Sequence, residues 1–268
     1  MLQKRIGDVI TNIKIKSDGV SISFEHHEKM TMSVDSFTDL RLYEGKLLTL
    51  NEVAELEQVA ASDKYYLYAL KLLAKDARSI KEIRNKVLAK GADEETTEIV
   101  ISRLAKVGLL NDEAYAETFK KDVGDLRLYG KHKILYELRL KGIPSSIVSK
   151  LEFSEKEELD KAFRYASILN RKYVKSPSEK KATQAIASLL QRGFDESIAE
   201  AAVDACVSPN DEESEKKLLQ RYFQLSKAKY ARKYGGYQLR EKIFVDLRKK
   251  GFKSHDIKQM IAQEEDDL

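Results

Sequence analysis

Residues 83–91 read IRNKVLAKG, and the pattern in these letters returns three more times along the chain. The other copies are ILYELRLKG at 134–142, AIASLLQRG at 185–193 and IFVDLRKKG at 243–251. Each copy places two apolar residues four positions apart, then a base, then a glycine. Apolar residues with this spacing share one face of a helix, and a terminal glycine adopts the left-handed conformation cheaply. The repeat therefore predicts four helices with a buried face, each ending at a Lys-Gly or Arg-Gly turn.

The base before each glycine has a structural explanation. A cation in the last turn of a helix interacts favourably with the negative end of the helix dipole. We therefore interpret these four bases as helix-terminating residues rather than ligand contacts. They are Lys90, Lys141, Arg192 and Lys250.

Helical periodicity extends to both sides of each repeated helix, and the glycines are 51, 51 and 58 residues apart. Longer helices are expected before the repeated ones, at 63–75, 111–127, 155–173 and 211–233. Shorter ones are expected after them, at 93–106, 144–151, 195–206 and 254–263. Capping-box spacing marks helix starts at Thr49/Glu52, Ser79/Glu82, Ser154/Glu157 and Ser176/Glu179. One unit of about 50 residues barely supports itself, so neighbouring units should stack.

The first part of the chain has a different periodicity. Apolar residues alternate in three short runs, at 13–15, 20–24 and 30–34, separated by polar turns that include Asp18-Gly19. Such runs are typical of a β-meander, and Leu47-Leu48 could add a short strand. Three strands of this size are marginal alone and must pack on another element.

The predicted fold class is mainly α: an elongated tandem array of four three-helix repeats, preceded by a small N-terminal antiparallel β subdomain. The expected domains are the β subdomain at 1–48, a linker helix with repeat 1 at 49–110, repeat 2 at 111–152, repeat 3 at 153–207 and repeat 4 at 208–268.

Composition excludes several classes of protein. The 268 residues include 12 Gly, 3 Pro and 1 Cys, so a disulfide-stabilised fold is excluded and a reducing compartment is indicated. No run approaches the roughly 18 apolar residues that cross a bilayer, and residues 1–5 do not begin a signal peptide. We therefore expect a cytoplasmic protein that does not contact membranes.

The sequence offers no active site. Phosphate-binding loops, nucleophile elbows and zinc-ligand spacings are missing. His26-His27 fits a solvated turn better than a metal site, and Cys206 lies in an alanine-rich run that favours a packed thiol. We predict no catalytic residue, no metal and no cofactor, and hence no enzyme.

Positive charge concentrates near the C-terminus. Residues 215–250 hold twelve bases and three acids, a net charge of +9 within a chain of net charge +4. Tyr222, Tyr230, Tyr234 and Tyr237 lie among these bases. A basic surface with aromatic rings suits a phosphate backbone with stackable bases, whereas a solvated charged face is the plainer alternative. The third repeated helix carries no charge at its outward positions, so repeats 2 and 4 are the better candidates for contact.

Three segments resemble the motifs of the bacterial RecX family. They are ARSIKEIRNKVLAKG at 77–91, LAKVGLLNDEAYA at 104–116 and GKHKILYELRLKGI at 130–143. The N-terminal β segment and the additional helical units are similar to the longer RecX proteins of Gram-positive bacteria. The third repeat departs most from the pattern, with Thr183 and Ala185 where larger or basic residues are expected.

The resemblance implies a non-enzymatic regulator of the RecA recombinase. Such proteins bind the RecA filament on single-stranded DNA, block its extension or promote its disassembly, and bind DNA themselves, duplex DNA more weakly and without sequence preference. A monomer is expected. The residues expected to contact the filament are Arg78, Lys81, Arg84, Lys133, Arg139, Lys242, Arg248 and Lys249.

Two other functions fit the residues alone. A helical-repeat adaptor that binds only proteins would show no salt-sensitive affinity for DNA. A sequence-nonspecific DNA-binding protein would show such affinity without any effect on RecA. A sequence-reading repressor is disfavoured, because 144–151 offers only serines and Lys150 as polar groups for a recognition helix.

Overall fold

The computed structural model describes residues 7–16 and 19–264 of the chain. These residues form two compact units, which are described separately below. Unit 1 comprises Met1–Glu117 and Leu138–Lys150, and unit 2 comprises Thr118–Glu137 and Leu151–Leu268.

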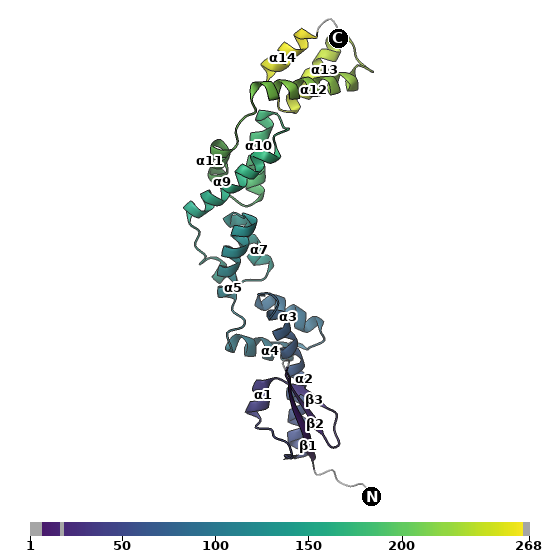
Figure 1. Ribbon diagram of the computed structural model, residues 1–268, viewed down its shortest axis with the longest axis vertical. Helices are drawn as coiled ribbons and strands as arrows, with labels where there is room; N and C mark the ends of the chain where they lie inside the picture. Colours follow the sequence, from purple (N-terminus) through teal and green to yellow (C-terminus); the bar gives the residue numbers. More distant parts are fainter. Residues whose placement is uncertain (1–6, 17–18, 265–268) are drawn as a thin grey trace. The chain divides into compact units, whose positions relative to one another are not determined.

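Unit 1 begins with the predicted antiparallel sheet (Figure 1). Its strands are β1 (Asp8–Lys16), β2 (Gly19–Phe24), β3 (Met30–Met32) and β4 (Leu47–Leu48), in the order β3-β2-β1-β4. The turn residues Ser17 and Asp18 lie outside the described residues. The third strand ends earlier than expected, because Ser33 caps a short helix, α1 (Val34–Asp39), by accepting the N–H of Ser36.

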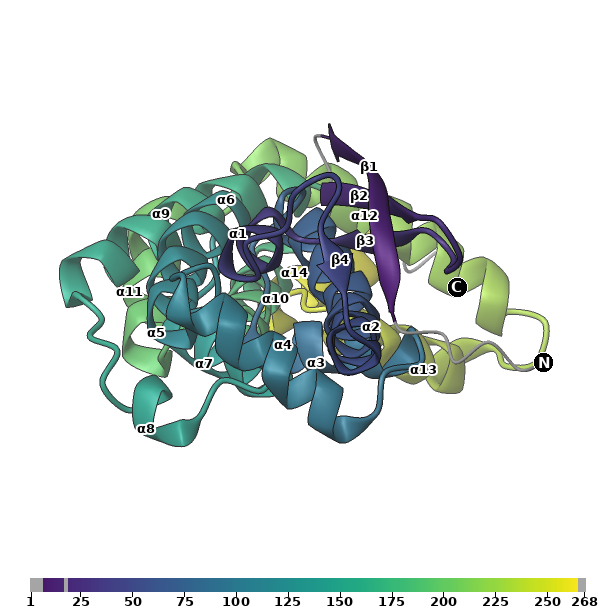
Figure 2. The same ribbon diagram turned by 90° about the horizontal axis from the view of Figure 1, so that it is seen from below.

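The sheet packs on a long helix, α2 (Leu50–Leu73) (Figure 2). Ile10, Ile22 and Leu48 are buried in one cluster with Val53 and Leu56 of α2. Ile15 is 72% exposed, although it pairs with the buried Val20 of β2, and the pairing of β1 with β2 is irregular between Ile10 and Asn12. The long helix therefore supplies the support that so small a sheet needs.

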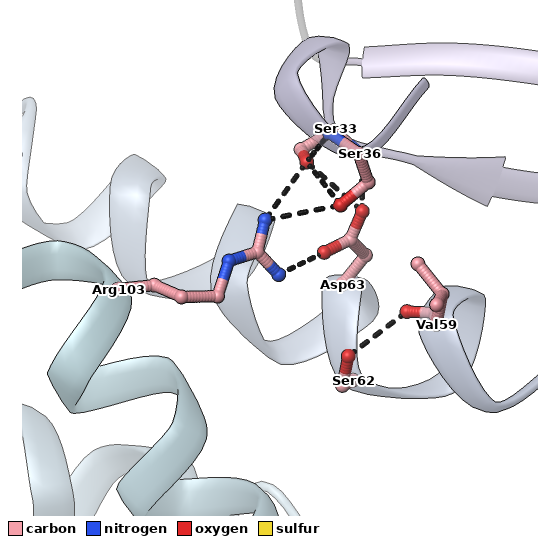
Figure 3. A network of polar contacts seen from close by, with 6 residues as sticks. All are labelled: Ser33, Ser36, Val59, Ser62, Asp63 and Arg103. Carbon is pink, nitrogen blue, oxygen red and sulfur yellow. Dashed lines mark hydrogen bonds and ion pairs between the residues drawn. The ribbon is translucent and has the colours of Figure 1, made fainter. Parts of the chain in front are cut away.

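A buried polar network also ties the sheet region to the helices (Figure 3). The Asp63 carboxylate, on α2, accepts the N–H of Ser33 at 2.7 Å and its hydroxyl at 2.9 Å. The guanidinium of Arg103 forms an ion pair with Asp63 and donates to the hydroxyls of Ser33 and Ser36. Asp63 is fully buried, so this carboxylate depends on these donors for its solvation.

Repeat 1 is built from α2, α3 (Ile80–Ala89) and α4 (Glu94–Lys106). Its core includes Tyr66, Ile83, Val87, Val100 and Leu104. The expected linker helix and first repeat helix are one continuous helix, α2. The predicted capping boxes Thr49/Glu52 and Ser79/Glu82 are both present at helix starts.

The middle of the chain contributes to both units. Its helices are α5 (Asp112–Thr118), the π-helical segment η1 (Phe119–Val123), α6 (Gly124–Arg127), α7 (Lys131–Leu140) and α8 (Ser145–Val148). Leu128 adopts the left-handed conformation with φ 50°, which ends the first helical stretch. The boundary between units falls within α7, between Glu137 and Leu138.

The rest of unit 2 holds two three-helix groups (Figure 1). They are α9 (Glu155–Lys172), α10 (Ser178–Gln191) and α11 (Glu196–Cys206), then α12 (Glu212–Tyr230), α13 (Gly236–Lys249) and α14 (Ser254–Gln263). Each group surrounds its own apolar cluster, centred on Leu189 and Phe194 in the first and on Phe223 and Phe252 in the second. Cys206 is half-buried against the first cluster, as expected of a packed thiol.

Two predicted capping boxes are wrong. Ser154 precedes α9 but forms no side-chain cap, and the N-cap of α10 is Pro177 rather than Ser176. Ser176 instead donates to Gln184. The start of α10 is satisfied from elsewhere in the fold, as described below.

The prediction for the glycines is confirmed. Gly91, Gly142, Gly193 and Gly251 have φ between 79° and 101°. This is the left-handed region in which a Cβ is strained. Each therefore closes its helix as the sequence pattern indicates.

Candidate nucleic-acid interface

In unit 1 the end of α7 lies against the start of α3. The Ser79 hydroxyl donates to the carbonyl of Lys141 at 2.6 Å, and Lys141 Nζ lies 2.8 Å from Glu82 Oε1. Asp112, at the start of α5, accepts the N–H of Ile80 at 2.9 Å. Burial tends to raise the pKa of Glu82, but the bonds from Lys141 and the Ser79 N–H, together with the positive charges of Lys141 and Arg78, outweigh burial and lower the pKa. The start of α3 is thus covered by two elements of the following repeat: the end of its repeated helix, α7, and the start of its first helix, α5.

Within unit 2 the end of α10 meets the start of α7 in the same way. The N–H of His132 donates to the Gly193 carbonyl at 3.0 Å, and Glu158 of α9 accepts the N–H of Lys131 at 2.8 Å. Asp195 pairs with the Lys131 ammonium and lies 2.6 Å from the His132 ring. The bond from Lys131 holds the pKa of Asp195 below its usual value, against the effect of burial.

A third contact joins the end of α13 to the start of α10. Glu215 of α12 accepts the N–H of Ser178 at 3.1 Å and its hydroxyl at 2.9 Å. Asn210 donates to the same carboxylate at 2.8 Å, and Arg248 lies 3.5 Å from Glu179. We call these three contacts the inter-repeat joints. In each, a carboxylate from the later repeat accepts a backbone N–H at a helix start. At α3 it adds to the local Ser79 cap, whereas α10 has no side-chain cap of its own.

Three of the four closing glycines are part of these joints. A Cβ built on any of the three would overlap a residue at the start of the preceding repeated helix, whereas a Cβ on Gly91 would meet only the Tyr65 hydroxyl, at 3.9 Å. The three contacts are Gly142 with Lys81, Gly193 with Lys133, and Gly251 with Lys180. Glycine is therefore required here for close packing as well as for its backbone conformation.

The helix-terminating bases also have a recurring contact. Each cation lies over a tyrosine ring from the first helix of its own repeat, a favourable cation–π arrangement. The distances to the ring centroids are 5.5 Å for Lys90 and Tyr68, 5.8 Å for Lys141 and Tyr115, 4.2 Å for Arg192 and Tyr165, and 5.4 Å for Lys250 and Tyr222. All four bases lie at the ends of their helices, as the sequence pattern predicts.

The predicted contact residues of repeat 1 are partly engaged. Arg84 forms an ion pair with Glu98 of α4, and Arg78 lies 3.5 Å from Asp76 with a side chain that is 24% exposed. Lys81 is exposed, although its carbon chain packs over Gly142. Lys81 therefore has the freest charge of the three.

On α7 the two predicted residues differ. Lys133 Nζ lies 3.1 Å from Glu137 and 5.1 Å from the centroid of the Tyr136 ring. Arg139 is exposed and forms no ion pair with any described residue. Tyr136 and Leu140 are exposed as well, at 53% and 58%, so an apolar strip accompanies these cations.

On α13 the three predicted residues divide into two sets. Lys242 and Lys249 are exposed and pair with no acid in the part of the chain that the structure describes. The cation of Lys242 lies 5.7 Å from the Tyr234 ring centroid. Arg248 instead points into the joint, where it contacts Glu179 and donates to the Phe252 carbonyl at 2.6 Å. Lys242 and Lys249 are thus the cations of α13 that a polyanion can reach.

Comparisons with known proteins are consistent with this architecture. A family model described as the first three-helix domain of RecX matches residues 66–104, which span the end of α2, α3 and most of α4. A regulatory protein RecX from Lactococcus lactis subsp. cremoris strain SK11 is 32% identical over 218 residues, covering 77% of this chain and 80% of the relative. The chain belongs to the RecX family.

Other members of the RecX family match over more of the chain. The regulatory protein RecX of Streptococcus gordonii is 27% identical over 256 residues, 94% of this chain and 98% of its own length. A crystal structure of regulatory protein RecX is 23% identical and superposes with a TM-score of 0.58, covering 74% of this chain and 99% of that one. The structural likeness supports the helical fold.

The four tyrosines of the basic C-terminal segment of this RecX chain differ in exposure. Of the four tyrosines among the C-terminal bases, Tyr222 packs on Phe252 with ring centroids 5.7 Å apart, and Tyr230 and Tyr234 are half-buried. Tyr237 is 80% exposed. Of the four tyrosines among these bases, Tyr237 is therefore the one whose ring is mostly exposed.

Other kinds of site were sought in the same residues. Among residues 7–16 and 19–264 no cluster of His, Cys, Asp or Glu could hold a metal ion. No helix in the described part of the chain is long and apolar enough to cross a membrane. His27 is bonded to the buried Asp8 carboxylate, so its role is in the fold of the sheet.

Proposed function

We propose that this protein modulates, and mainly inhibits, the RecA recombinase. It binds the RecA filament on single-stranded DNA and blocks filament extension or promotes disassembly. Membership of the RecX family of regulatory proteins carries this proposal, because the likeness extends over most of the chain. The protein acts by binding rather than by catalysis, as a monomer in the cytoplasm.

The distribution of free cations supports a nucleic-acid contact. Lys242 and Lys249 of α13 are exposed and have no acidic partner among the described residues, and the same holds for Arg139 of α7. Cations that are not neutralised within the protein release counterions from phosphates when they bind, which stabilises the complex in a salt-dependent way. We therefore assign the electrostatic contact mainly to repeats 2 and 4.

Two of the predicted residues have a smaller part in this proposal. Arg84 is neutralised by Glu98 and Arg248 is engaged at a joint. Recruiting either one to DNA would require breaking a contact that the fold already makes. Lys81, Lys133 and Arg78 remain candidates for the contact in the first half of the array.

The ATPase of the cognate RecA on single-stranded DNA tests the proposal. Adding this protein at substoichiometric and then equimolar ratios should lower the rate progressively, while the protein with DNA alone hydrolyses nothing. Inhibition well below one protein per RecA would favour capping of growing ends over binding along the groove. An unchanged rate with the protein in excess would contradict the proposal and favour an adaptor without a role in recombination.

A further inference from the structure

The start of α13 differs from the starts of the other repeated helices. Asp112, Glu158 and Glu215 each accept a backbone N–H at the start of α3, α7 and α10. No described carboxylate does this for α13, which begins at Gly236 without a side-chain cap. The fourth repeat therefore exposes a surface that the other three repeats cover.

This surface is the turn between α12 and α13, residues 231–238, which we call the α12–α13 turn. Arg232 and Lys233 are exposed, and neither forms an ion pair with a described acid. Tyr237 is 80% exposed. Gly235 and Gly236 have open space around their Cα atoms, so a chain can approach the ring from their side. The turn thus combines two free cations with one free aromatic face.

Two acids of α13 lie near the turn, Glu241 and Asp246. Glu241 is exposed, four residues after Tyr237 and beside the exposed Lys242. Asp246 accepts the hydroxyl of Ser226 at 2.5 Å and lies within 4 Å of the ammonium groups of Lys229 and Lys250. Its charge is therefore already shared between two cations. The α12–α13 turn contains no acid of its own, so Arg232 and Lys233 give it a net positive charge, while the exposed Glu241 and Lys242 on the first turns of α13 have opposite charges.

We infer that the α12–α13 turn binds an unpaired nucleotide: the Tyr237 ring stacks on the base while Arg232 and Lys233 contact phosphates. This inference rests on the proposed function and names the residues that favour single-stranded over duplex nucleic acid. Stacking on an aromatic side chain requires a base whose face is free, and a base inside a duplex has none. Cations bind both forms, so the tyrosine is the element that distinguishes them.

A protein partner fits this surface less well. Aromatic anchors of protein interfaces sit in well-packed, largely apolar surroundings. Around Tyr237 the exposed residues of the turn are cations, glycines, an alanine and a glutamine. That composition suits a solvated phosphate backbone better than an apolar pocket on a protein.

The test uses the full chain and fluorescein-labelled oligo-dT, with a mixed-sequence duplex as the second ligand, in anisotropy titrations at several salt concentrations. Tyr237→Ala should weaken binding of oligo-dT by about five-fold or more and leave duplex affinity close to wild type. Tyr237→Phe should keep the affinity of the wild type, because stacking does not need the hydroxyl. Tyr43→Ala is the matched control, since Tyr43 is 62% exposed and belongs to unit 1.

A second variant tests the cations. Arg232→Ser with Lys233→Ser should weaken binding of both ligands and reduce the salt slope for oligo-dT by about 1.4, which is about 0.7 for each of the two lost phosphate contacts. The far-ultraviolet circular dichroism of every variant should match wild type, because the substituted side chains are exposed. If Tyr237→Phe binds oligo-dT as weakly as Tyr237→Ala does, the proposal that the ring stacks on a base is overturned.

Three further outcomes would overturn the inference. In the first, Tyr237→Ala binds oligo-dT as tightly as wild type does. In the second, it weakens the binding of oligo-dT and of the duplex equally. It could also leave free DNA affinity unchanged while losing inhibition of RecA, which would assign the turn to a protein contact. Inhibition of RecA is measured separately, by the RecA ATPase. If the wild-type protein inhibits RecA and Tyr237→Ala binds oligo-dT as tightly as wild type, this inference is refuted and the proposed function stands.

Discussion

Asp112 accepts the backbone N–H of Ile80 at 2.9 Å across 32 residues of sequence. A helix start is normally capped by a side chain from its own first turn or just before it. In this chain a carboxylate from the following repeat also accepts such an N–H at three successive repeats, and at α3 it does so in addition to the local Ser79 cap. The joints therefore make each repeat depend on its neighbour for satisfied backbone donors, which explains why the repeats form an array rather than independent domains.

Removing one joint carboxylate should destabilise the fold. Asp112→Ala leaves the N–H of Ile80 without its partner in a mostly buried place and should cost about 1–2 kcal/mol in urea unfolding. Glu113→Ala is the matched control, because Glu113 is the adjacent acid and is exposed. Equal stability of the two variants would show that the joint contributes nothing measurable.

Alanine at a joint glycine should cost more than alanine at a glycine with the same backbone conformation in open space. Gly193 has φ 87° and its Cβ would overlap the backbone of Lys133, whereas Gly108 has φ 76° with no atom within 4 Å. Gly108→Ala should cost about 1 kcal/mol from the backbone alone, and Gly193→Ala about 2 kcal/mol or more. Thermal or urea unfolding of both variants separates the cost of the steric overlap at the joint from the cost of the backbone conformation. Matching losses would refute close packing at the joint.

The Asp63 network should hold the sheet region to the helices. Asp63→Ala removes the acceptor of Ser33 and the partner of Arg103 and should cost about 3 kcal/mol. Amide exchange in the strands should accelerate with it. Ser62→Ala is the control, because that hydroxyl only donates to the Val59 carbonyl (Figure 3). Strand protection that is unchanged in Asp63→Ala would contradict a linking role.

Acid should destabilise the sheet through Asp8. Burial tends to raise the pKa of Asp8, but bonds from the His27 ring and from the N–H groups of Val9, His26 and His27 lower it from 3.8 to about 2. A lowered pKa in the folded state gives stability that is present above the unfolded pKa and is lost as pH falls through the folded one. Wild type should therefore lose this stability between pH 3.8 and about 2.

The comparison for this acid effect is Asp8→Asn, which should be less stable at neutral pH and lack that part of the pH dependence. Asp39→Asn, at an exposed position of α1, should retain the wild-type profile. Unfolding midpoints measured from neutral to acid pH give both curves. A wild-type curve that is parallel to that of Asp8→Asn would contradict the lowered pKa.

Features of the fold that depend on residues close together in the sequence were predicted better than features that depend on distant residues. The closing glycines, the bases before them and the boxes at Thr49 and Ser79 act within one helix turn, and the pattern predicted them correctly. The same local spacing at Ser154 and Ser176 forms no capping box, and at α10 a carboxylate from another repeat bonds the helix start instead. The α1 helix was missed because Val34 continued an alternating run, and only the bond from Ser36 to Ser33 ends that strand. The π-helical segment at Phe119–Val123 likewise has no local signature.

The candidate site was predicted less well, because free charge is a tertiary property. Arg84, Arg248, Lys242 and Lys249 look alike as bases on outward helix positions. The structure pairs Arg84 with Glu98 and Arg248 with Glu179, and leaves the other two without acids among the described residues. The acids of the joints, Asp112, Glu158 and Glu215, were missed for the same reason, since their partners lie 27 to 37 residues away.

Charge reversal tests the placement of the electrostatic contact. Lys242→Glu with Lys249→Glu should weaken binding to single-stranded DNA and reduce the salt slope by about one or more. Lys172→Glu with Lys175→Glu makes the same change of net charge at exposed positions of repeat 3 and should have a smaller effect. Equal losses in the two variants, measured by anisotropy at several salt concentrations, would show that net charge matters and position does not.

The most direct test of the proposed function is the single-stranded-DNA-dependent ATPase of the cognate RecA, titrated with wild type and with these two charge-reversal variants. Wild type and the repeat 3 variant should lower the rate progressively, and the Lys242→Glu, Lys249→Glu variant should need a markedly higher concentration. A rate that stays constant with wild type in excess would contradict the assignment of this protein as a regulator of the RecA filament.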